Sequence, residues 1–178
     1  RRWPSLATQF VVGSVGESDL ELLQTSEYLF QKLRLSRIYY SKFTPVSDTP
    51  FENLPPENPL REFRLYQAGF LLRDYGFTME EMNFLANGNL PLNQDPKLAW
   101  AKANLLTAPI EINTADRAQL LRVPGFGPKG VDAILRTRQK NPLKETGDLR
   151  RLGIKPDRAL EFILMNGKYP IQQLQLFY

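Results

Sequence analysis

The fold of the last third of the chain depends on the residues Pro124-Gly125-Phe126-Gly127-Pro128-Lys129. Apolar helical patterns precede and follow them, and two glycines around one apolar residue let the backbone reverse tightly, because glycine adopts a positive φ without a Cβ clash. We expect Phe126 to point inward and the neighbouring N–H groups to face outward at the start of the second helix. Backbone donors and the helix dipole favour an anion there, and Lys129 adds a positive charge. These residues therefore predict a phosphate-binding turn, whose simplest ligand is a nucleic acid.

The residues around this turn predict two helix–turn–helix units in tandem. Asn113 or Thr114 is expected to cap the helix before the turn, and the helix after it should span about residues 129–138. A weaker repeat follows, with the turn Gly153-Ile154-Lys155 and a helix over residues 157–164. Two such units pack as a small, all-α, four-helix domain.

Residues 112–115, 120–127 and 133–138 resemble the helix-hairpin-helix family. The likeness is closest to the tandem form of competence DNA receptors and many repair proteins, and it covers about residues 109–167. The resemblance implies binding of the duplex DNA backbone without recognition of sequence. It assigns phosphate contacts to the amides of Gly125, Phe126 and Gly127, assisted by Lys129.

The chain departs from this family at two places. Gly130 stands where a small alanine is frequent, and Lys155 stands where the second hairpin usually has a second glycine. Gly153 and Lys155 are therefore candidate DNA contacts with two alternatives: Lys155 holds phosphate by its side chain, or the second hairpin serves only packing. A further alternative is that the hairpin pair connects domains or binds protein.

Composition limits the chemistry of the chain. It has 178 residues, 42% of them hydrophobic, which is typical of a packed globular protein. Without cysteine it has no disulfide, thiolate metal site or cysteine nucleophile, and without histidine it lacks the commonest general base. We therefore predict no catalytic or metal-binding residues. No run is long enough to span a bilayer and none is typical of a secretory signal, so we expect a cytoplasmic protein with no membrane partner.

The positive charge is concentrated in the last third. Residues 110–178 hold 12 Lys and Arg against 7 Asp and Glu, a net +5, while the rest of the chain carries −1. Such asymmetry favours a polyanionic partner. The alternative is a solvated basic face without a ligand.

The first part of the chain predicts a βαβ unit. Residues 9–12 form a short apolar run ending at Gly13, as expected of a buried parallel strand. A capping box at residues 18–21 begins a helix that continues to about Arg34, and residues 37–40 are a second strand. Asn58 and Pro59 then begin a helix that ends at Gly76, followed by a short helix over residues 78–86.

These patterns predict a mixed α/β chain. A helix over residues 95–104 lies in the linker, and the last residues show neither a cap nor a helical period. The predicted regions are residues 1–86 (the C-terminal part of a (β/α) barrel), 87–108 (a linker with a connecting helix), 109–168 (the tandem hairpin domain) and 169–178 (a tail).

Residues 10–18 and 39–50 resemble the late strands of radical S-adenosylmethionine (SAM) barrels. Residues 10–18 have the pattern apolar-Gly-x-x-Gly-Glu of the fifth strand, and residues 39–50 are similar to the sixth. Together with residues 61–67 and the hairpin domain, they most resemble radical SAM proteins of DNA modification or repair. The resemblance implies S-adenosylmethionine close to Gly13, Gly16 and Glu17. The alternative for Glu17 is a carboxylate that only stabilises a helix end.

This resemblance also implies parts that the chain does not contain. Such enzymes hold a [4Fe–4S] cluster on three cysteines of an early C-x3-C-x2-C loop, and the chain has no cysteine. Two strands cannot close a barrel, which takes about 200 residues or more. The chain begins with Arg1 rather than Met, as expected of a processed chain or of a piece of a longer protein. The resemblance implies that the cluster loop and the first four strands are missing and that this piece is inactive alone. The alternative function is a non-catalytic DNA-binding protein, of the repair or competence type, with a structural βαβ region.

The end of the chain matches a docking peptide. Gln173-Leu174-Gln175-Leu176-Phe177 is similar to the pentapeptide by which bacterial proteins bind the sliding clamp. Leu174, Leu176 and Phe177 would enter an apolar groove, and Gln173 would donate a hydrogen bond at its rim. The alternative is a tail that folds back on its own domain.

Overall fold

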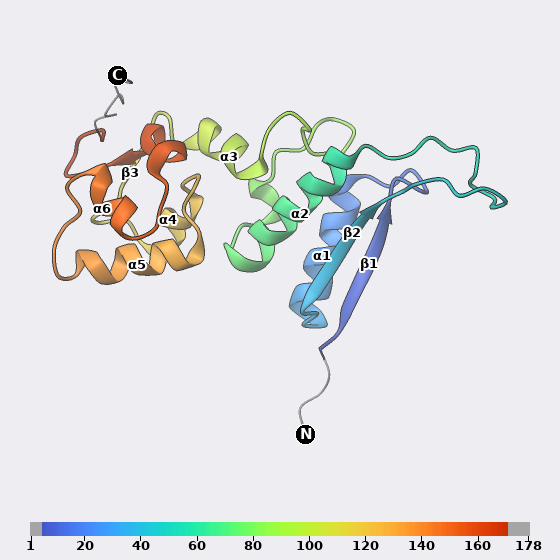
Figure 1. Cartoon of the computed structure of the whole chain (residues 1–178), viewed down its shortest axis with the longest axis horizontal. Helices are drawn as coiled ribbons and strands as arrows, with labels where there is room; N and C mark the ends of the chain where they lie inside the picture. Colours follow the sequence, from blue (N-terminus) through green and yellow to red (C-terminus); the bar gives the residue numbers. More distant parts are fainter. Residues whose placement is uncertain (1–4, 171–178) are drawn as a thin grey trace, which may run out of the picture. The chain divides into compact units, whose positions relative to one another are not determined.

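The computed structural model describes residues 5–170, and the chain is mixed α/β with two small parallel sheets (Figure 1). It divides into two compact units, Arg1–Pro96 and Lys97–Tyr178, and the division falls inside the predicted linker. The elements are β1 (Ala7–Val12), α1 (Asp19–Lys32), β2 (Arg37–Lys42), α2 (Pro59–Asp74), α3 (Pro96–Asn104), β3 (Ile110–Glu111), α4 (Arg117–Arg122), α5 (Pro128–Arg138), α6 (Thr146–Arg151) and β4 (Ile163–Leu164). Single 3₁₀ turns lie at Met79–Glu81, Pro156–Arg158 and Leu160–Phe162.

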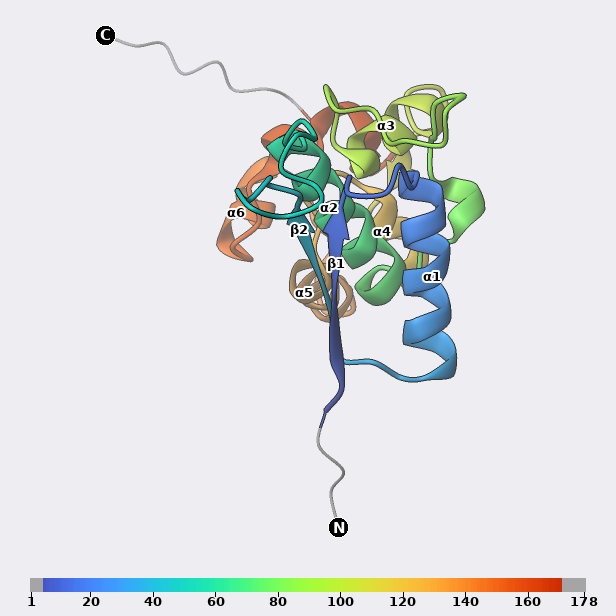
Figure 2. The same cartoon turned by 90° about the vertical axis from the view of Figure 1, so that its right-hand side faces the viewer.

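The first unit contains the predicted βαβ motif. β1 and β2 pair in parallel from Ala7 opposite Arg37 to Val12 opposite Lys42, and α1 begins with the predicted capping box of Ser18 and Glu21. Helices α1 and α2 lie side by side against the sheet (Figures 1 and 2). The described residues form no closed barrel.

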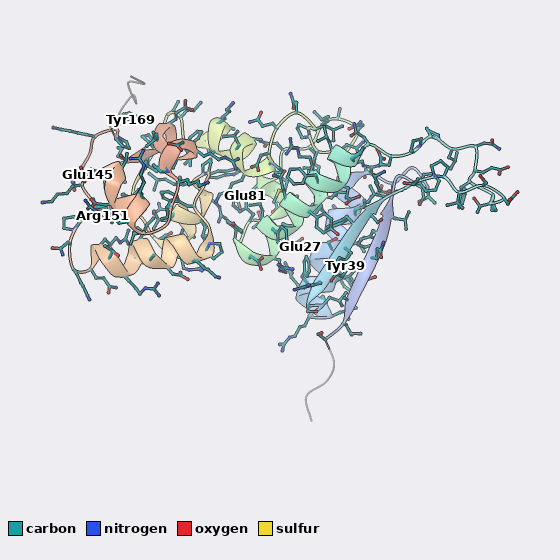
Figure 3. The ribbon with its side chains drawn as sticks, viewed as in Figure 1. Glu27, Tyr39, Glu81, Glu145, Arg151 and Tyr169 are labelled. Carbon is teal, nitrogen blue, oxygen red and sulfur yellow. The ribbon has the colours of Figure 1, made fainter. Side chains whose placement is uncertain are left out.

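Among residues 5–170, helices cover one face of this sheet and leave the other open. Ile38 and Tyr40 of β2 are buried under the helices, whereas Tyr39 (labelled in Figure 3) is 42% exposed and Val11 of β1 is 52% exposed. The expectation of a buried β1 was therefore wrong, because apolar character alone does not show whether both faces of a strand have a neighbour. Under the helices, burial raises the pKa of Tyr40 to about 12, against the effect of its hydrogen bond with Ser26.

A buried ion pair joins the ends of three segments of the first unit. Asp19 is fully buried at the start of α1 and accepts hydrogen bonds from Arg61 Nε (2.7 Å) and from the Leu90 N–H (2.8 Å). The Leu20 N–H donates to the Gly88 carbonyl nearby. The helix predicted over residues 78–86 is only one 3₁₀ turn, because the backbone that follows it is held by these tertiary contacts.

The sequence predicts an all-α second unit, but the structure contains a short parallel strand pair there. β3 and β4 pair in parallel, and the Ile112 N–H donates to the Leu164 carbonyl. The helix expected over residues 157–164 is replaced by two 3₁₀ turns and β4. The entry and the exit of the hairpin pair lie side by side, so their backbone groups satisfy one another as a short sheet.

The helix before the first turn begins later than predicted. Its N-cap is Asp116, which forms a capping box with Gln119, rather than Asn113 or Thr114. The Asn113 side chain instead accepts from the Leu143 N–H and donates to the Leu143 carbonyl, both at 2.9 Å. Several polar residues here match a capping pattern. The long-range bond to Leu143 removes Asn113 from the helix start and leaves Asp116 as the N-cap.

We predict that Asp19→Ala lowers the free energy of unfolding by about 3 kcal/mol, because it leaves the buried Arg61 charge short of a partner. Denaturant unfolding of the full chain measures this. Gln24→Ala, on an exposed position of α1, is the control and should change the free energy by less than about 0.5 kcal/mol. Equal effects of the two substitutions would show that the ion pair does not hold the unit together.

Candidate nucleic-acid interface

The first hairpin bends at Gly125 and buries Phe126 as the sequence predicts, but Gly127 is extended, with a φ of −99°. α4 ends at Arg122, α5 begins at Pro128, and Gly125 between them adopts a φ of +85°, a conformation that strongly favours glycine. Phe126 is 1% exposed, so its ring points inward as expected. Gly127 is the N-cap of α5 and has no side chain to bond the N–H groups of the first turn. The hairpin therefore presents a helix N-terminus capped by backbone alone.

The amides of the turn do not all remain available. The Phe126 N–H donates to the Val123 carbonyl at 3.1 Å inside the turn. The prediction that this N–H contacts phosphate is therefore wrong. The N–H groups of Gly125 and Gly127 have no hydrogen-bond acceptor among residues 5–170. These two amides are the candidate donors to an anion.

Basic side chains lie beside these amides. Lys129 is exposed in the first turn of α5. The second hairpin touches the first, because a Cβ placed on Gly125 would lie 3.4 Å from Arg158 Cβ and 3.5 Å from the Lys155 carbonyl oxygen. The exposed residues Lys155 and Arg158 are thereby brought next to the first turn. We call Gly125, Gly127, Lys129, Lys155 and Arg158 the hairpin site.

The second hairpin does not repeat the first. The Gly153 N–H donates to the Arg150 carbonyl at 2.9 Å and the Ile154 N–H donates to the Leu149 carbonyl at 3.0 Å. A 3₁₀ turn rather than an α-helix follows. Gly153 therefore has the positive φ of a turn (+76°) but a bonded amide. Of the two sequence alternatives for this hairpin, its backbone favours packing.

The contact between the hairpins explains why position 130 is glycine rather than alanine. A Cβ on this residue would lie 3.1 Å from Ile154 Cγ1, closer than an ordinary contact. Ile154 is buried at the turn of the second hairpin. The second hairpin thus occupies the space that a methyl group at position 130 would need.

Lys97 is a buried polar residue of this region that the sequence did not indicate. It lies at the start of α3, and its ammonium donates to the Phe126 carbonyl at 2.6 Å. A lysine in the first turn of a helix gives no sequence signal of burial. Only the path of α3 past the hairpin shows the contact.

The loop predicted to lie near a cofactor has its backbone N–H groups bonded by the carboxylate of Glu17, and Glu57 lies against Gly13. Gly13 and Gly16 have φ values of +86° and +80°, and Glu17 accepts hydrogen bonds from the N–H groups of Gly13 (2.5 Å) and Val15 (3.3 Å). Arg61 donates to the backbone carbonyl of Glu17 and, at 2.5 Å, to the Glu57 carboxylate. The chain also has no cysteine for a cluster. These residues alone do not fit S-adenosylmethionine with an iron–sulfur cluster, and we derive no chemical step through either.

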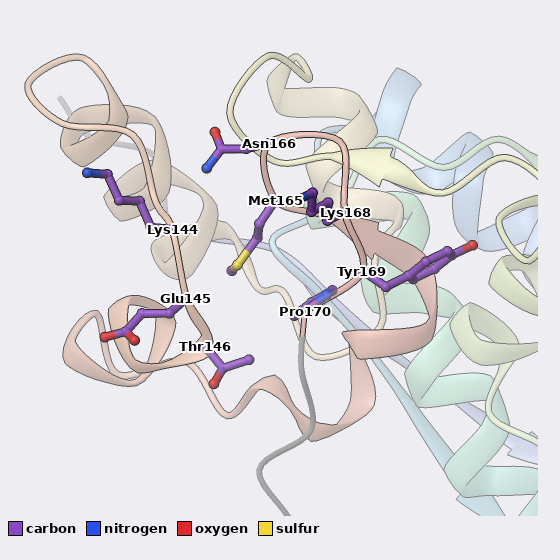
Figure 4. Close-up of a pocket in the computed structure, with 8 residues that line it drawn as sticks. All are labelled: Lys144, Glu145, Thr146, Met165, Asn166, Lys168, Tyr169 and Pro170. Carbon is purple, nitrogen blue, oxygen red and sulfur yellow. The ribbon is translucent and has the colours of Figure 1, made fainter.

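A pocket of about 550 Å³ opens beside α6 (Figure 4). Glu145 on its rim lies 3.6 Å from Arg151, whose guanidinium also bonds Asp148 at 2.6 Å. The lining residues are Lys144, Glu145, Thr146, Met165, Asn166, Lys168, Tyr169 and Pro170. None of them belongs to the hairpin site.

Comparisons of the chain with protein-family models, with curated proteins and with solved structures find no match. Among residues 5–170, no three acidic side chains are grouped so that they could hold a metal ion. Within the same part of the chain, every helix is too short or too polar to cross a bilayer. The clamp-binding residues Gln173, Leu174, Leu176 and Phe177 lie outside the described residues.

Proposed function

We propose that the second unit binds the sugar–phosphate backbone of duplex DNA through the first hairpin, without recognition of sequence. The observation that carries this proposal is the pair of amides on Gly125 and Gly127, which have no acceptor among the described residues and lie at the N-terminus of α5. An anion placed there would accept both hydrogen bonds and gain from the helix dipole.

The charges of the second unit support a polyanion as the ligand. Lys129 follows the two amides, and Lys155 and Arg158 flank Gly125 from the second hairpin. Cations near the backbone of DNA release condensed counterions, so binding of this kind weakens as salt rises. Amides and lysines that contact phosphate position a protein on the duplex but carry no base information.

We further propose that the first unit is the C-terminal part of a radical SAM barrel in a cytoplasmic DNA modification or repair protein. The supporting observation is the parallel βαβ motif whose sheet has helices on one face and an exposed face with Val11 and Tyr39. Parallel sheets normally have both faces covered. In this proposal the remaining strands, the cluster and S-adenosylmethionine belong to the whole protein. The alternative remains a DNA-binding protein whose βαβ unit is only a support.

The tail carries a third proposal, which comes from the sequence alone. Gln173, Leu174, Leu176 and Phe177 would dock into the apolar groove of a bacterial sliding clamp. This docking would require no change in the hairpin.

Replacing both Gly125 and Gly127 by valine should abolish duplex binding while most of the far-UV helical signal remains. A β-branched residue is strained at the φ of Gly125, and a side chain at either position covers an amide. Fluorescence anisotropy with a labelled duplex at several salt concentrations measures the affinity. Wild-type binding should fall steeply with salt and vary little among duplex sequences.

Gly167→Val is the matched control for backbone strain. Gly167 also has a positive φ (+77°) and lies in the second unit with no atom close to its Cβ position. This variant should bind duplex like the wild type. Normal binding by the double hairpin variant would refute the phosphate-binding turn.

The barrel proposal makes a prediction about the gene. The roughly 200 codons before Arg1, the length that a barrel needs, should encode a C-x3-C-x2-C motif, because the cluster requires three thiolates. Sequencing upstream of the Arg1 codon tests this. An initiator methionine adjacent to Arg1 would instead support the non-catalytic alternative.

The tail proposal predicts capture of the chain by a purified bacterial sliding clamp. Deletion of the last six residues should abolish this capture, and Leu174→Ala with Phe177→Ala should do the same, because both remove the apolar anchors. A pull-down measures the captured fraction. Duplex binding should be unchanged in both variants, and capture of the truncated chain would contradict the assignment.

A further inference from the structure

Lys97 buries its charge against the back of the first hairpin. The residue is 8% exposed, and its ammonium lies 2.6 Å from the Phe126 carbonyl oxygen. Removal of an ammonium group from water is costly unless strong hydrogen bonds replace its hydration. Lys102, on the same helix, is exposed as lysines usually are. The position of Lys97 is therefore unusual, and the hairpin supplies an acceptor for its ammonium.

The bond to Phe126 fixes one particular N–H group. The Phe126 carbonyl and the Gly127 N–H belong to the same peptide unit, which is planar and trans, so the two bonds point in opposite directions. When Lys97 holds the oxygen on the inner side, the Gly127 N–H points to the outer side. The preceding peptide is held as well, because the Phe126 N–H donates to the Val123 carbonyl.

The same bond also strengthens the N–H group as a donor. A cation at a carbonyl oxygen draws electron density through the conjugated peptide and leaves the N–H more positive. Charge-assisted bonds are stronger than neutral ones, and linked hydrogen bonds polarise each other in a medium of low dielectric constant. An anion at Gly127 therefore benefits from a charge that it does not touch.

We propose that Lys97 is a positioning residue of the phosphate site, which orients and polarises the Gly127 N–H from inside the protein. This inference rests on the proposed function, since it assigns a role in the binding of DNA phosphate. It adds a buried cation of α3 to a site whose other members are on the hairpins. The nucleic acid contacts Gly127 and never reaches Lys97.

Lys97→Met tests the role, because it keeps the aliphatic stem and removes the ammonium. In the full chain we expect duplex affinity to fall about tenfold, the effect of losing one charge-assisted orienting bond. The slope of log affinity against log salt should not change, because Lys97 neutralises no phosphate. Lys102→Met is the matched control on the same helix and should bind like the wild type. Lys129→Met should lower the slope by about one.

An NMR readout separates positioning from general stability. In ¹⁵N-labelled protein without DNA, Lys97→Met should shift the amide signal of Gly127 and accelerate its hydrogen exchange, while amides of α6 keep their shifts. Addition of duplex to the wild type should shift both the Gly127 amide and the Lys97 ammonium signal, since one peptide unit joins them. This second measurement needs no variant and holds even if Lys97→Met does not fold.

Two results would overturn the inference. One is equal duplex affinity of Lys97→Met and Lys102→Met, and the other is a Lys97 ammonium signal that does not respond when duplex shifts Gly127. A salt slope reduced by one in Lys97→Met would show a direct phosphate contact and overturn it as well. The proposed function fails separately, if the Gly125→Val and Gly127→Val double variant binds duplex normally.

Discussion

The burial of the Phe126 ring is the constraint on which the hairpin depends. A phenylalanine side chain gains about 2–3 kcal/mol on transfer from water to a protein interior, and here the ring belongs to the central residue of a turn. The chain buries it through a sharp bend at Gly125, which has a positive φ, while Gly127 on the other side is extended. The inward ring leaves the flanking amides at the surface. An interaction of the core therefore shapes the turn on which the proposed phosphate site rests.

Polar groups behind the ring make this arrangement specific. The Val123 carbonyl accepts from the Phe126 N–H, and Lys97 donates to the Phe126 carbonyl. Both polar groups of Phe126 are satisfied within the protein, whereas the amides of Gly125 and Gly127 have no acceptor among residues 5–170. The second hairpin lacks this division, because Gly153 and Ile154 use their amides in the preceding helical turn. One hairpin presents donors, and the other supplies packing and charge.

The first unit combines an apolar core, which includes Leu23 and Leu65, with a buried ion pair. Arg61 contacts carboxylates of Asp19 and Glu57, and Asp19 also holds the backbone at Leu90. These contacts lie on the helix side and at the ends of the strands, so they do not cover the opposite face of the sheet. The unit can therefore fold around α1 and α2 while Val11 and Tyr39 stay exposed. That open face is the observation that supports the barrel proposal, because parallel sheets normally have both faces covered.

Local residue patterns were enough to predict the parallel βαβ motif, the capping box at Ser18 and the turn with Phe126 inside. Each depends on neighbouring residues whose periodicity or backbone freedom is visible in the chain. Other features follow from contacts between distant residues. Such contacts placed Asn113 on Leu143 instead of at a helix start, formed β3 and β4 where a helix was expected, and left one face of β1 exposed. They also put Lys97 under Phe126, because hydrogen bonds between residues far apart in the chain outweigh weak local preferences.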